Sequence, residues 1–247
     1  MVVCCCDGSV DGILTAVFEA WSIDIKTSRI QVPGNSNMEW FADYREVATD
    51  SEKAARVTRA IINRISEEAF EMVYMAALTN AADRGDAILQ FIRKGMRIGP
   101  QITSDLQDRY VMRVFEMYRN CSKEYQHYRG FLRFRQQGEY LLAKFEPKND
   151  IITMMVQFFS DRLRQEKFVI VDMIRFKAGV YAPESGYCIT EVEPDTISML
   201  RYDTEEDYFR ELWNTFERNI AIEARYNMKL QQQNMPLRFR KYMDIRR

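Results

Sequence analysis

The sequence predicts an α+β fold in which a central helical bundle joins a mainly antiparallel sheet. Residues 50–128 carry apolar side chains at helical spacing, whereas residues 129–193 show short apolar runs between turn residues. Helices grouped between strand-bearing segments favour α+β over the alternating α/β pattern. We expect one compact domain over residues 1–247, with a helical and basic segment at 204–247.

The first expected elements are a strand, a helix and a second strand. Val2 to Cys6 is a short apolar run that ends at the turn residues Asp7 to Ser9. Apolar residues then recur at helical spacing from Val10 to Trp21. The run from Lys26 to Val32 indicates the second strand, which Pro33 to Asn35 ends.

A helix-rich segment follows, and each of its helices begins after a residue that can cap it. The expected caps are Asp50, Ser66, Asp83 and, for a long fourth helix, the capping-box pair Ser104 and Gln107. The third helix is expected to end near Gly95 to Pro100, where helix-breaking residues gather.

The pattern changes to strands after the fourth helix. Phe131 to Arg135 and Tyr140 to Phe145 predict an antiparallel hairpin around Gly138. Arg133 and Arg135 are expected on one face of its first strand, because side chains in a strand alternate between faces. The later elements expected are a helix capped by Asn149 or Asp150 and packed on the sheet, strands at Phe168–Ile174, Gly179–Tyr181 and Tyr187–Glu193, and a helix opened by Thr204 and Asp207.

Composition excludes several classes of protein. Apolar residues make up 47% and charged residues 29%, a globular balance. The net charge of −1 excludes a uniformly basic nucleic-acid binder but leaves a local basic patch open. Val2 to Cys6 is too short for a signal peptide, and no apolar run is long enough for a membrane helix. Five cysteines, three of them adjacent, do not form a secreted disulfide framework, so we expect a reduced, cytoplasmic protein.

Several blocks of the sequence resemble an uncharacterised bacterial family of probable DNA-metabolism proteins. The blocks are Asp7 to Ala20, His127 to Phe134, Phe145 to Ile151, Phe159 to Arg162, Ile170 to Arg175, Ile220 to Asn227 and Pro236 to Lys241. Proteins of this family accompany a radical-SAM protein of DNA modification or repair, and some are fused to a uracil-DNA-glycosylase-like domain. The resemblance therefore implies DNA metabolism, a radical-SAM partner and a uracil-DNA-glycosylase-like protein as a further partner, but no reaction.

The loop from Asp7 to Gly12 lies between a strand and a helix, where backbone N–H groups can receive an anion. However, the loop lacks the lysine of a P-loop, and Asp7 and Asp11 would repel a phosphate. A capped strand-to-helix turn is the plainer interpretation. Binding of an anion, or of a phosphate together with a metal ion, is the sharper interpretation. An enzyme acting on nucleotides or nucleic acid would have Asp7, Asp11 and His127 near one pocket.

Two other residue sets have a structural and a functional interpretation. Cys4, Cys5 and Cys6 lack the spacing of metal ligands, so we expect buried free thiols, with no metal or other cofactor. His127 is the single histidine, and it comes near the end of the long helix. When protonated, its positive charge there can interact favourably with the dipole of the helix C-terminus. Alternatively, His127 can serve as a general acid or base.

Basic residues give two candidate anion sites in the strand-bearing segment. Arg133 and Arg135, with Lys144 and nearby phenylalanines, could contact phosphates and stack bases. A solvated outer face over buried rings is the alternative. Arg162 and Arg175 flank Asp172 along the chain, as a structural ion pair or as a pocket that grips phosphate.

Charge reverses sharply near the end of the chain. Residues 191–211 hold eight acidic and two basic residues. Residues 225–247 hold one acidic residue, Asp244, and seven basic ones: Arg225, Lys229, Arg238, Arg240, Lys241, Arg246 and Arg247. This basic segment suits contact with a nucleic-acid backbone, although it could instead pair with the acidic segment or dock a partner.

The sequence thus favours a nucleic-acid-binding accessory protein of DNA metabolism. An enzyme acting on nucleotides or nucleic acid, with a pocket near Asp7, Asp11 and His127, is the first alternative. A purely structural adaptor is the second.

Overall fold

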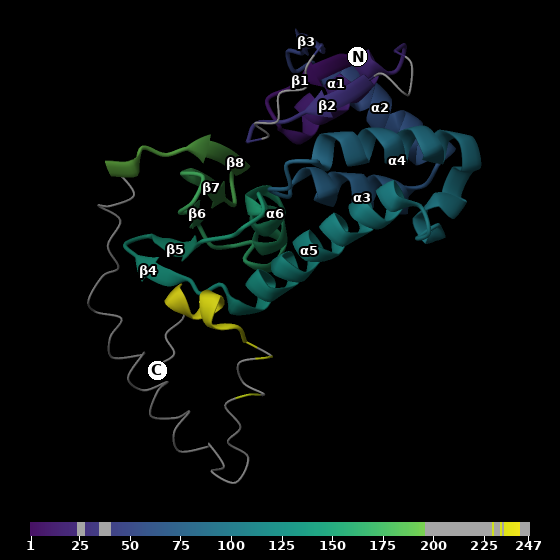
Figure 1. Ribbon diagram of the computed structural model, residues 1–247. Coiled ribbons are helices and arrows are strands. Elements are labelled where there is room, and N and C mark those ends of the chain that lie inside the picture. Colours follow the sequence, from purple (N-terminus) through teal and green to yellow (C-terminus); the bar gives the residue numbers. More distant parts are fainter. Residues whose placement is uncertain (24–27, 35–40, 196–228, 230–232, 234, 243–247) are drawn as a thin grey trace. The chain divides into compact units, whose positions relative to one another are not determined.

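The computed structural model describes residues 1–23, 28–34, 41–195, 229, 233 and 235–242 (Figure 1). Its helices and two sheets confirm the α+β class. By its internal packing the chain divides into two compact units, Met1–Lys123 and Glu124–Arg247, and each is described by itself. The expected single domain over residues 1–247 stays a prediction.

The first unit begins with a parallel sheet and continues as helices. Its elements are β1 (Val2–Cys5), α1 (Val10–Ala20), β2 (Ser28–Gln31), β3 (Asp43–Glu46), α2 (Ser51–Arg64), α3 (Glu67–Ala77), α4 (Arg84–Ile98) and the 3-10 helix η1 (Gly99–Ser104). The strands lie in the order β2-β1-β3, and both pairings are parallel. This sheet is parallel because α1 carries the chain back between β1 and β2. It is separate from the mainly antiparallel sheet expected after the helix-rich segment, which the second unit contains. β3 escaped sequence analysis because all four of its residues are exposed and show no apolar alternation.

Side-chain caps begin most helices of the first unit. Asp50 accepts hydrogen bonds from two N–H groups at the start of α2, and the Ser66 hydroxyl accepts one from Ala69 in α3, as predicted. Asp83 precedes α4 but makes no capping hydrogen bond. The Ser104 capping box is wrong: Ser104 ends η1, and the Asp108 carboxylate receives the first N–H groups of the next helix.

α4 packs closely on β2. A Cβ atom at Gly85 would lie 2.7 Å from a methyl carbon of Ile30, so only glycine allows this approach. Farther along α4, the buried Arg93 donates hydrogen bonds to the Ser28 hydroxyl and to the carbonyl oxygens of Ala20 and Ile23. One guanidinium thus ties the end of α1 to β2 and α4.

The long helix α5 (Arg109–Phe131) crosses the boundary between the units. The second unit then contains β4 (Arg135–Gln137), β5 (Tyr140–Phe145), α6 (Ile152–Arg162), β6 (Phe168–Asp172), β7 (Lys177–Ala182), β8 (Gly186–Glu191) and the 3-10 helix η4 (Leu237–Tyr242). Its sheet has the order β4-β5-β6-β7-β8 and is antiparallel except between β5 and β6, which α6 connects. The β4–β5 hairpin turns at Gly138, whose φ of 60° favours glycine.

α6 covers one face of this sheet, which confirms its predicted packing. A Cβ atom at Gly179 of β7 would lie 2.0 Å from Val156 of α6, so the strand fits closely under the helix. On the same side, Phe134 contacts the rings of Phe159 and Phe168. The predicted start of the hairpin at Phe131 is wrong, because α5 continues through Phe131 and β4 begins only at Arg135.

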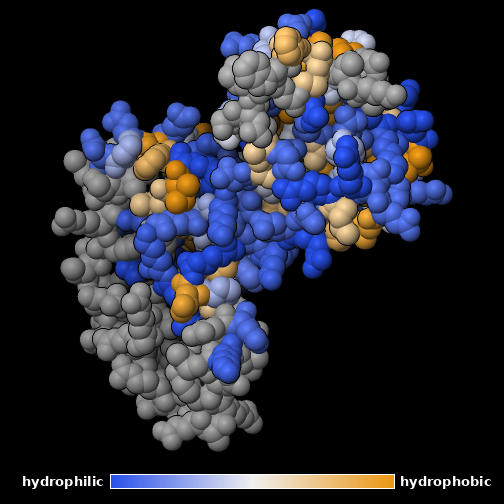
Figure 2. Space-filling view, in the orientation of Figure 1, coloured by the Kyte–Doolittle hydropathy of each residue, from blue (hydrophilic) through white to orange (hydrophobic). Residues whose placement is uncertain are grey.

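Polar side chains dominate the surface seen in Figure 2, and apolar ones form small separate patches on it. None of the described helices combines the length and apolarity that a membrane crossing requires. The helix expected from Thr204, and Arg225, Arg246 and Arg247 of the basic segment, lie outside the described residues.

Candidate nucleic-acid interface

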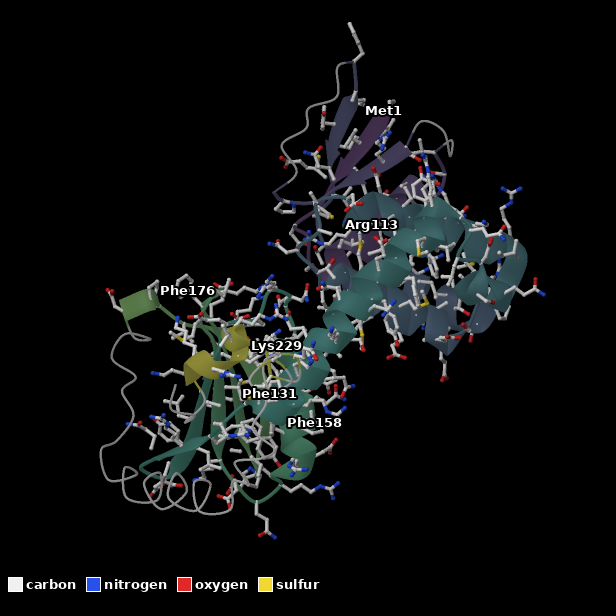
Figure 3. The ribbon with its side chains drawn as sticks, turned by 60° about the horizontal axis from the view of Figure 1, so that its bottom comes forward. Met1, Arg113, Phe131, Phe158, Phe176 and Lys229 are labelled. Atoms are coloured by element: carbon white, nitrogen blue, oxygen red, sulfur yellow. The ribbon has the colours of Figure 1, made fainter. Side chains whose placement is uncertain are left out.

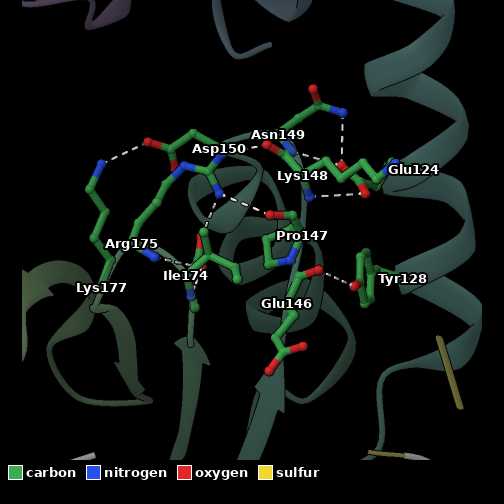
Figure 4. A network of polar contacts seen from close by, with 11 residues as sticks. Glu124, Tyr128, Glu146, Pro147, Lys148, Asn149, Asp150, Ile174, Arg175 and Lys177 are labelled. Carbon is green, nitrogen blue, oxygen red and sulfur yellow. Dashed lines mark hydrogen bonds and ion pairs between the residues drawn. The ribbon is translucent and has the colours of Figure 1, made fainter. Parts of the chain in front are cut away.

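The loop Glu146–Asp150, which follows β5, is held against α5 by one buried carboxylate (Figure 4). Glu124 of α5 accepts hydrogen bonds from the backbone N–H of Lys148 at 3.1 Å and of Asn149 at 2.8 Å. The side-chain amide of Asn149 donates a third, at 2.7 Å. Both carboxylate oxygens of Glu124 are therefore occupied, as burial of a charge requires.

A second buried carboxylate holds the other side of this loop. Asp172, at the end of β6, accepts from the N–H groups of Ile174 and Arg175 and from the Arg175 guanidinium. Arg175 also donates to the carbonyl oxygens of Pro147 and Lys148 (Figure 4). Burial raises the pKa of Asp172 although these hydrogen bonds oppose the rise. The contacts of Arg175 favour the structural ion pair over a phosphate pocket.

Arg162 does not join that pair among the described contacts. Arg162 is exposed at the C-terminal end of α6, shortly before the start of β6. Arg175 comes just after the end of β6, so the whole strand lies between the two arginines in the chain. A strand of this length spans about 13 Å. An anion pocket shared by Arg162 and Arg175 stays a prediction that no described contact supports.

Two further contacts complete the fixing of the loop. The Tyr128 hydroxyl of α5 donates to the carbonyl oxygen of Glu146 at 2.9 Å. Lys177 of β7 forms an ion pair of 2.7 Å with Asp150. Asn149 and Asp150 are thus engaged by Glu124 and Lys177, and neither caps α6, which begins after Ile151 without a side-chain cap.

Within the second unit, the basic helix η4 packs against α5 through Phe239, which is only 4% exposed. Its ring lies 4.8 to 5.4 Å, centroid to centroid, from the rings of Tyr128, His127 and Phe131 of α5. Figure 3 shows Phe131 close to η4, which is drawn in yellow. The ring contacts of His127 test neither its favourable charge at the helix C-terminus nor its acid–base role, so both stay predictions.

Two basic side chains flank Phe239 and face acids of the same unit. The Arg238 guanidinium lies 4.5 Å from the Phe239 ring centroid and 3.4 Å from a Glu124 oxygen. Lys241 pairs with Glu146. The side chains of Arg238 and Lys241 nevertheless remain 41% and 58% exposed. Their acidic partners lie outside residues 191–211, the segment that sequence analysis considered.

The other basic residues of the predicted interface differ in exposure. Lys229 is exposed. Arg240 is half-buried, and its Nε and Nη2 atoms have no hydrogen-bond partner in the part of the chain that the structure describes.

The predicted basic strand face is only partly formed. Arg133 precedes β4 and donates to the carbonyl oxygens of Gly130 and Leu132, so it caps the end of α5. Its predicted place beside Arg135 on one strand face is therefore wrong. Arg135 instead shares a face with Lys144, whose pKa is lowered by burial and by the Arg135 charge.

The loop at Asp7 has the geometry of a capped turn. The Ser9 backbone N–H and hydroxyl donate to one carboxylate oxygen of Asp7, and Thr49 donates to the other. Partial burial raises the pKa of Asp7, but these hydrogen bonds outweigh it and lower the pKa. Asp11 is exposed in the first turn of α1. Asp7 and Asp11 belong to the first unit and His127 to the second, so their common pocket stays a prediction.

The cysteines Cys4, Cys5 and Cys6 are free thiols. Burial raises their pKa values, so they carry less thiolate than an exposed cysteine at the same pH.

Glu124, which organises the loop, is not among the residues predicted from the sequence. A signal was present, because Glu124 follows Cys121 by three residues and precedes Tyr128 by four, on the apolar stripe of α5. A carboxylate at such a position indicates a buried polar network.

A comparison with known proteins identifies the family. No curated protein matches the chain. A family model described as a domain of unknown function, DUF4130, matches residues 82–244. The match covers well over half of the chain and includes the Glu124 loop contacts and η4. The protein therefore belongs to the DUF4130 family of domains of unknown function.

Proposed function

We propose that this protein binds nucleic acid through the basic surface of η4, as an accessory protein of DNA metabolism. In keeping with the sequence resemblance, its partners in this role are a radical-SAM protein and a uracil-DNA-glycosylase-like protein. The observation that carries the proposal is the docking of η4, because buried Phe239 holds Arg238 and Lys241 at the surface. Cations that are already positioned lose less conformational entropy when they meet a phosphate.

Both cations can exchange their present partners for phosphate at little cost. Glu124 is satisfied by three N–H groups at 2.7 to 3.1 Å, and Arg238 is more distant, at 3.4 Å. Lys241 is more than half exposed, and exposed ion pairs contribute about 0–1 kcal/mol. The contacts therefore leave the positive charge of η4 available.

The test is fluorescence anisotropy of labelled single-stranded and duplex oligonucleotides at about 50 mM salt, where electrostatic binding is strong. The parent protein should bind. The double variant Arg238→Gln, Lys241→Gln should bind about tenfold more weakly, because two phosphate contacts are lost. Arg164→Gln is the matched control, since it removes one charge from a side chain that is 77% exposed and remote in sequence from η4.

Two results would count against the proposal. If the parent binds neither form, the protein is better described as an adaptor. If Arg164→Gln weakens binding as much as a single η4 substitution, the attraction is diffuse and η4 is not the interface.

A further inference from the structure

A cavity of about 440 Å³ lies in the first unit between α1, α2 and α4. Its lining includes Val17, Phe18, Trp21, Arg56, Arg64 and Met96, and we call it the Trp21 pocket. The volume falls in the range of small-molecule sites. Within the described part of the chain, neither the basic segment nor the loop at Asp7 contributes to this lining.

The walls of the Trp21 pocket suit a flat apolar ring. Val17 and Val57 are buried side chains of α1 and α2, and Met96 of α4 adds a flexible apolar contact. Trp21 is 48% exposed, which is unusual for so large an apolar side chain. An indole with a free face can stack on an incoming aromatic ring.

The rim of the pocket is positively charged. The Arg56 guanidinium lies 5.0 Å from the Phe18 ring centroid, which positions it. Arg64 follows eight residues later on α2, a rise of about 12 Å. Neither arginine forms an ion pair within the described residues, whereas the acidic Glu19 of the rim is neutralised by Lys53 at 2.7 Å.

We propose that the Trp21 pocket binds an unpaired nucleotide, with its base in the cavity and its phosphates at Arg56 and Arg64. The inference rests on the proposed function and deepens it, because it names single-stranded nucleic acid as the substrate class. Apolar walls, a half-exposed indole and two guanidiniums that form no ion pair among the described residues together match an aromatic ring that carries negative charge. A base within a duplex is stacked on both faces and cannot enter, whereas an unpaired base can.

The test measures quenching of Trp21 fluorescence by three probes: nucleoside 5′-monophosphates, a single-stranded oligothymidylate and ribose 5-phosphate. The nucleotide and the oligonucleotide should quench, and the sugar phosphate should not, because it lacks a ring to stack. The chain has three tryptophans, so the signal is assigned by its loss in Trp21→Phe. Quenching by the free nucleotide alone would identify a mononucleotide site and overturn the single-strand proposal.

Two variants separate the ring contact from the charge contact. Ala60→Phe fills the pocket and keeps every charge, and Arg64→Gln removes one exposed charge and keeps the cavity. Each should weaken single-strand binding about tenfold, because one stacked base or one well-placed charge contributes about that much to affinity. Arg59→Gln is the matched control, because Arg59 is an exposed arginine of the same helix outside the lining. It should leave binding within about twofold of the parent.

The η4 variant distinguishes failure of this inference from failure of the proposed function. If Arg238→Gln, Lys241→Gln weakens single-strand binding while Ala60→Phe and Arg64→Gln do not, the pocket inference is overturned and the proposed function stands. If no oligonucleotide binds the parent, both are overturned. Equal binding of duplex and single strand in every variant would also overturn the pocket inference.

Discussion

Glu124 is the residue on which the Glu146–Asp150 loop depends most. Its two oxygens accept three N–H groups of Lys148 and Asn149, and all of these atoms lie in the interior or at its edge. On the other side of the loop, Arg175 donates to two carbonyl oxygens while Asp172 holds its guanidinium. Two buried carboxylates thus determine the conformation of one short segment.

Replacing Glu124 should therefore be costly. Glu124→Ala leaves three donors without an acceptor, and we expect the free energy of unfolding to fall by about 3 kcal/mol. Urea denaturation monitored by circular dichroism measures this free energy. Lys123→Ala is the control at the neighbouring exposed position and should change stability by less than about 0.5 kcal/mol. A similar small loss for Glu124→Ala would show that water or other groups satisfy the loop.

Asp83 offers a test by pH. Arg113 donates to both of its carboxylate oxygens, at 2.7 and 2.9 Å, and these hydrogen bonds lower the pKa of Asp83 from its ordinary 3.8. A lowered native pKa stabilises the fold above the ordinary value, and the gain is lost as pH falls through the native one. Asp83→Asn should thus reduce stability at about pH 6 and differ little from the parent at about pH 2.5. A stability difference that does not change with pH would mean that the Asp83 charge contributes nothing.

At the scale of elements, the start of a helix was predicted correctly where the capping side chain has no competing tertiary partner. Asp50 and Ser66 cap α2 and α3 as the sequence indicates. The sequence predicts a cap for α6 at Asn149 or Asp150 with the same local pattern. In the structure Asn149 instead donates to Glu124, and Asp150 pairs with Lys177. Sequence alone does not reveal such distant partners, so helix starts are predictable only where tertiary contacts agree with local ones.

The docking of η4 can be tested through its buried ring. Phe239→Ala removes contacts with three aromatic rings, and we expect a loss of about 3 kcal/mol in stability. Trypsin should then cut sooner after Arg238, Arg240 or Lys241, because a detached segment is accessible. Leu237→Ala, whose side chain is 64% exposed on the same helix, is the control and should be cut at the parent rate. Unchanged cleavage in Phe239→Ala would show that other contacts hold η4.

For the whole molecule, the sequence predicted the class of fold better than the sheet topology. Grouped helices and a later hairpin-rich segment are visible in hydrophobic periodicity, which depends on local pattern. The parallel sheet is not visible in this periodicity, because its edge strand β3 is exposed at every residue. The charge of the basic segment was likewise visible, but the pairing of Arg238 and Lys241 with Glu124 and Glu146 depends on contacts between distant segments.

The most direct measurement of the central claim is the salt dependence of single-strand binding by the whole chain. Each phosphate that the protein neutralises contributes about −0.7 to the slope of log affinity against log salt. The parent should bind with a steep negative slope, and Arg238→Gln, Lys241→Gln should flatten it by about 1.4. Equal slopes for the two proteins, or no binding by the parent at about 50 mM salt, would contradict the account.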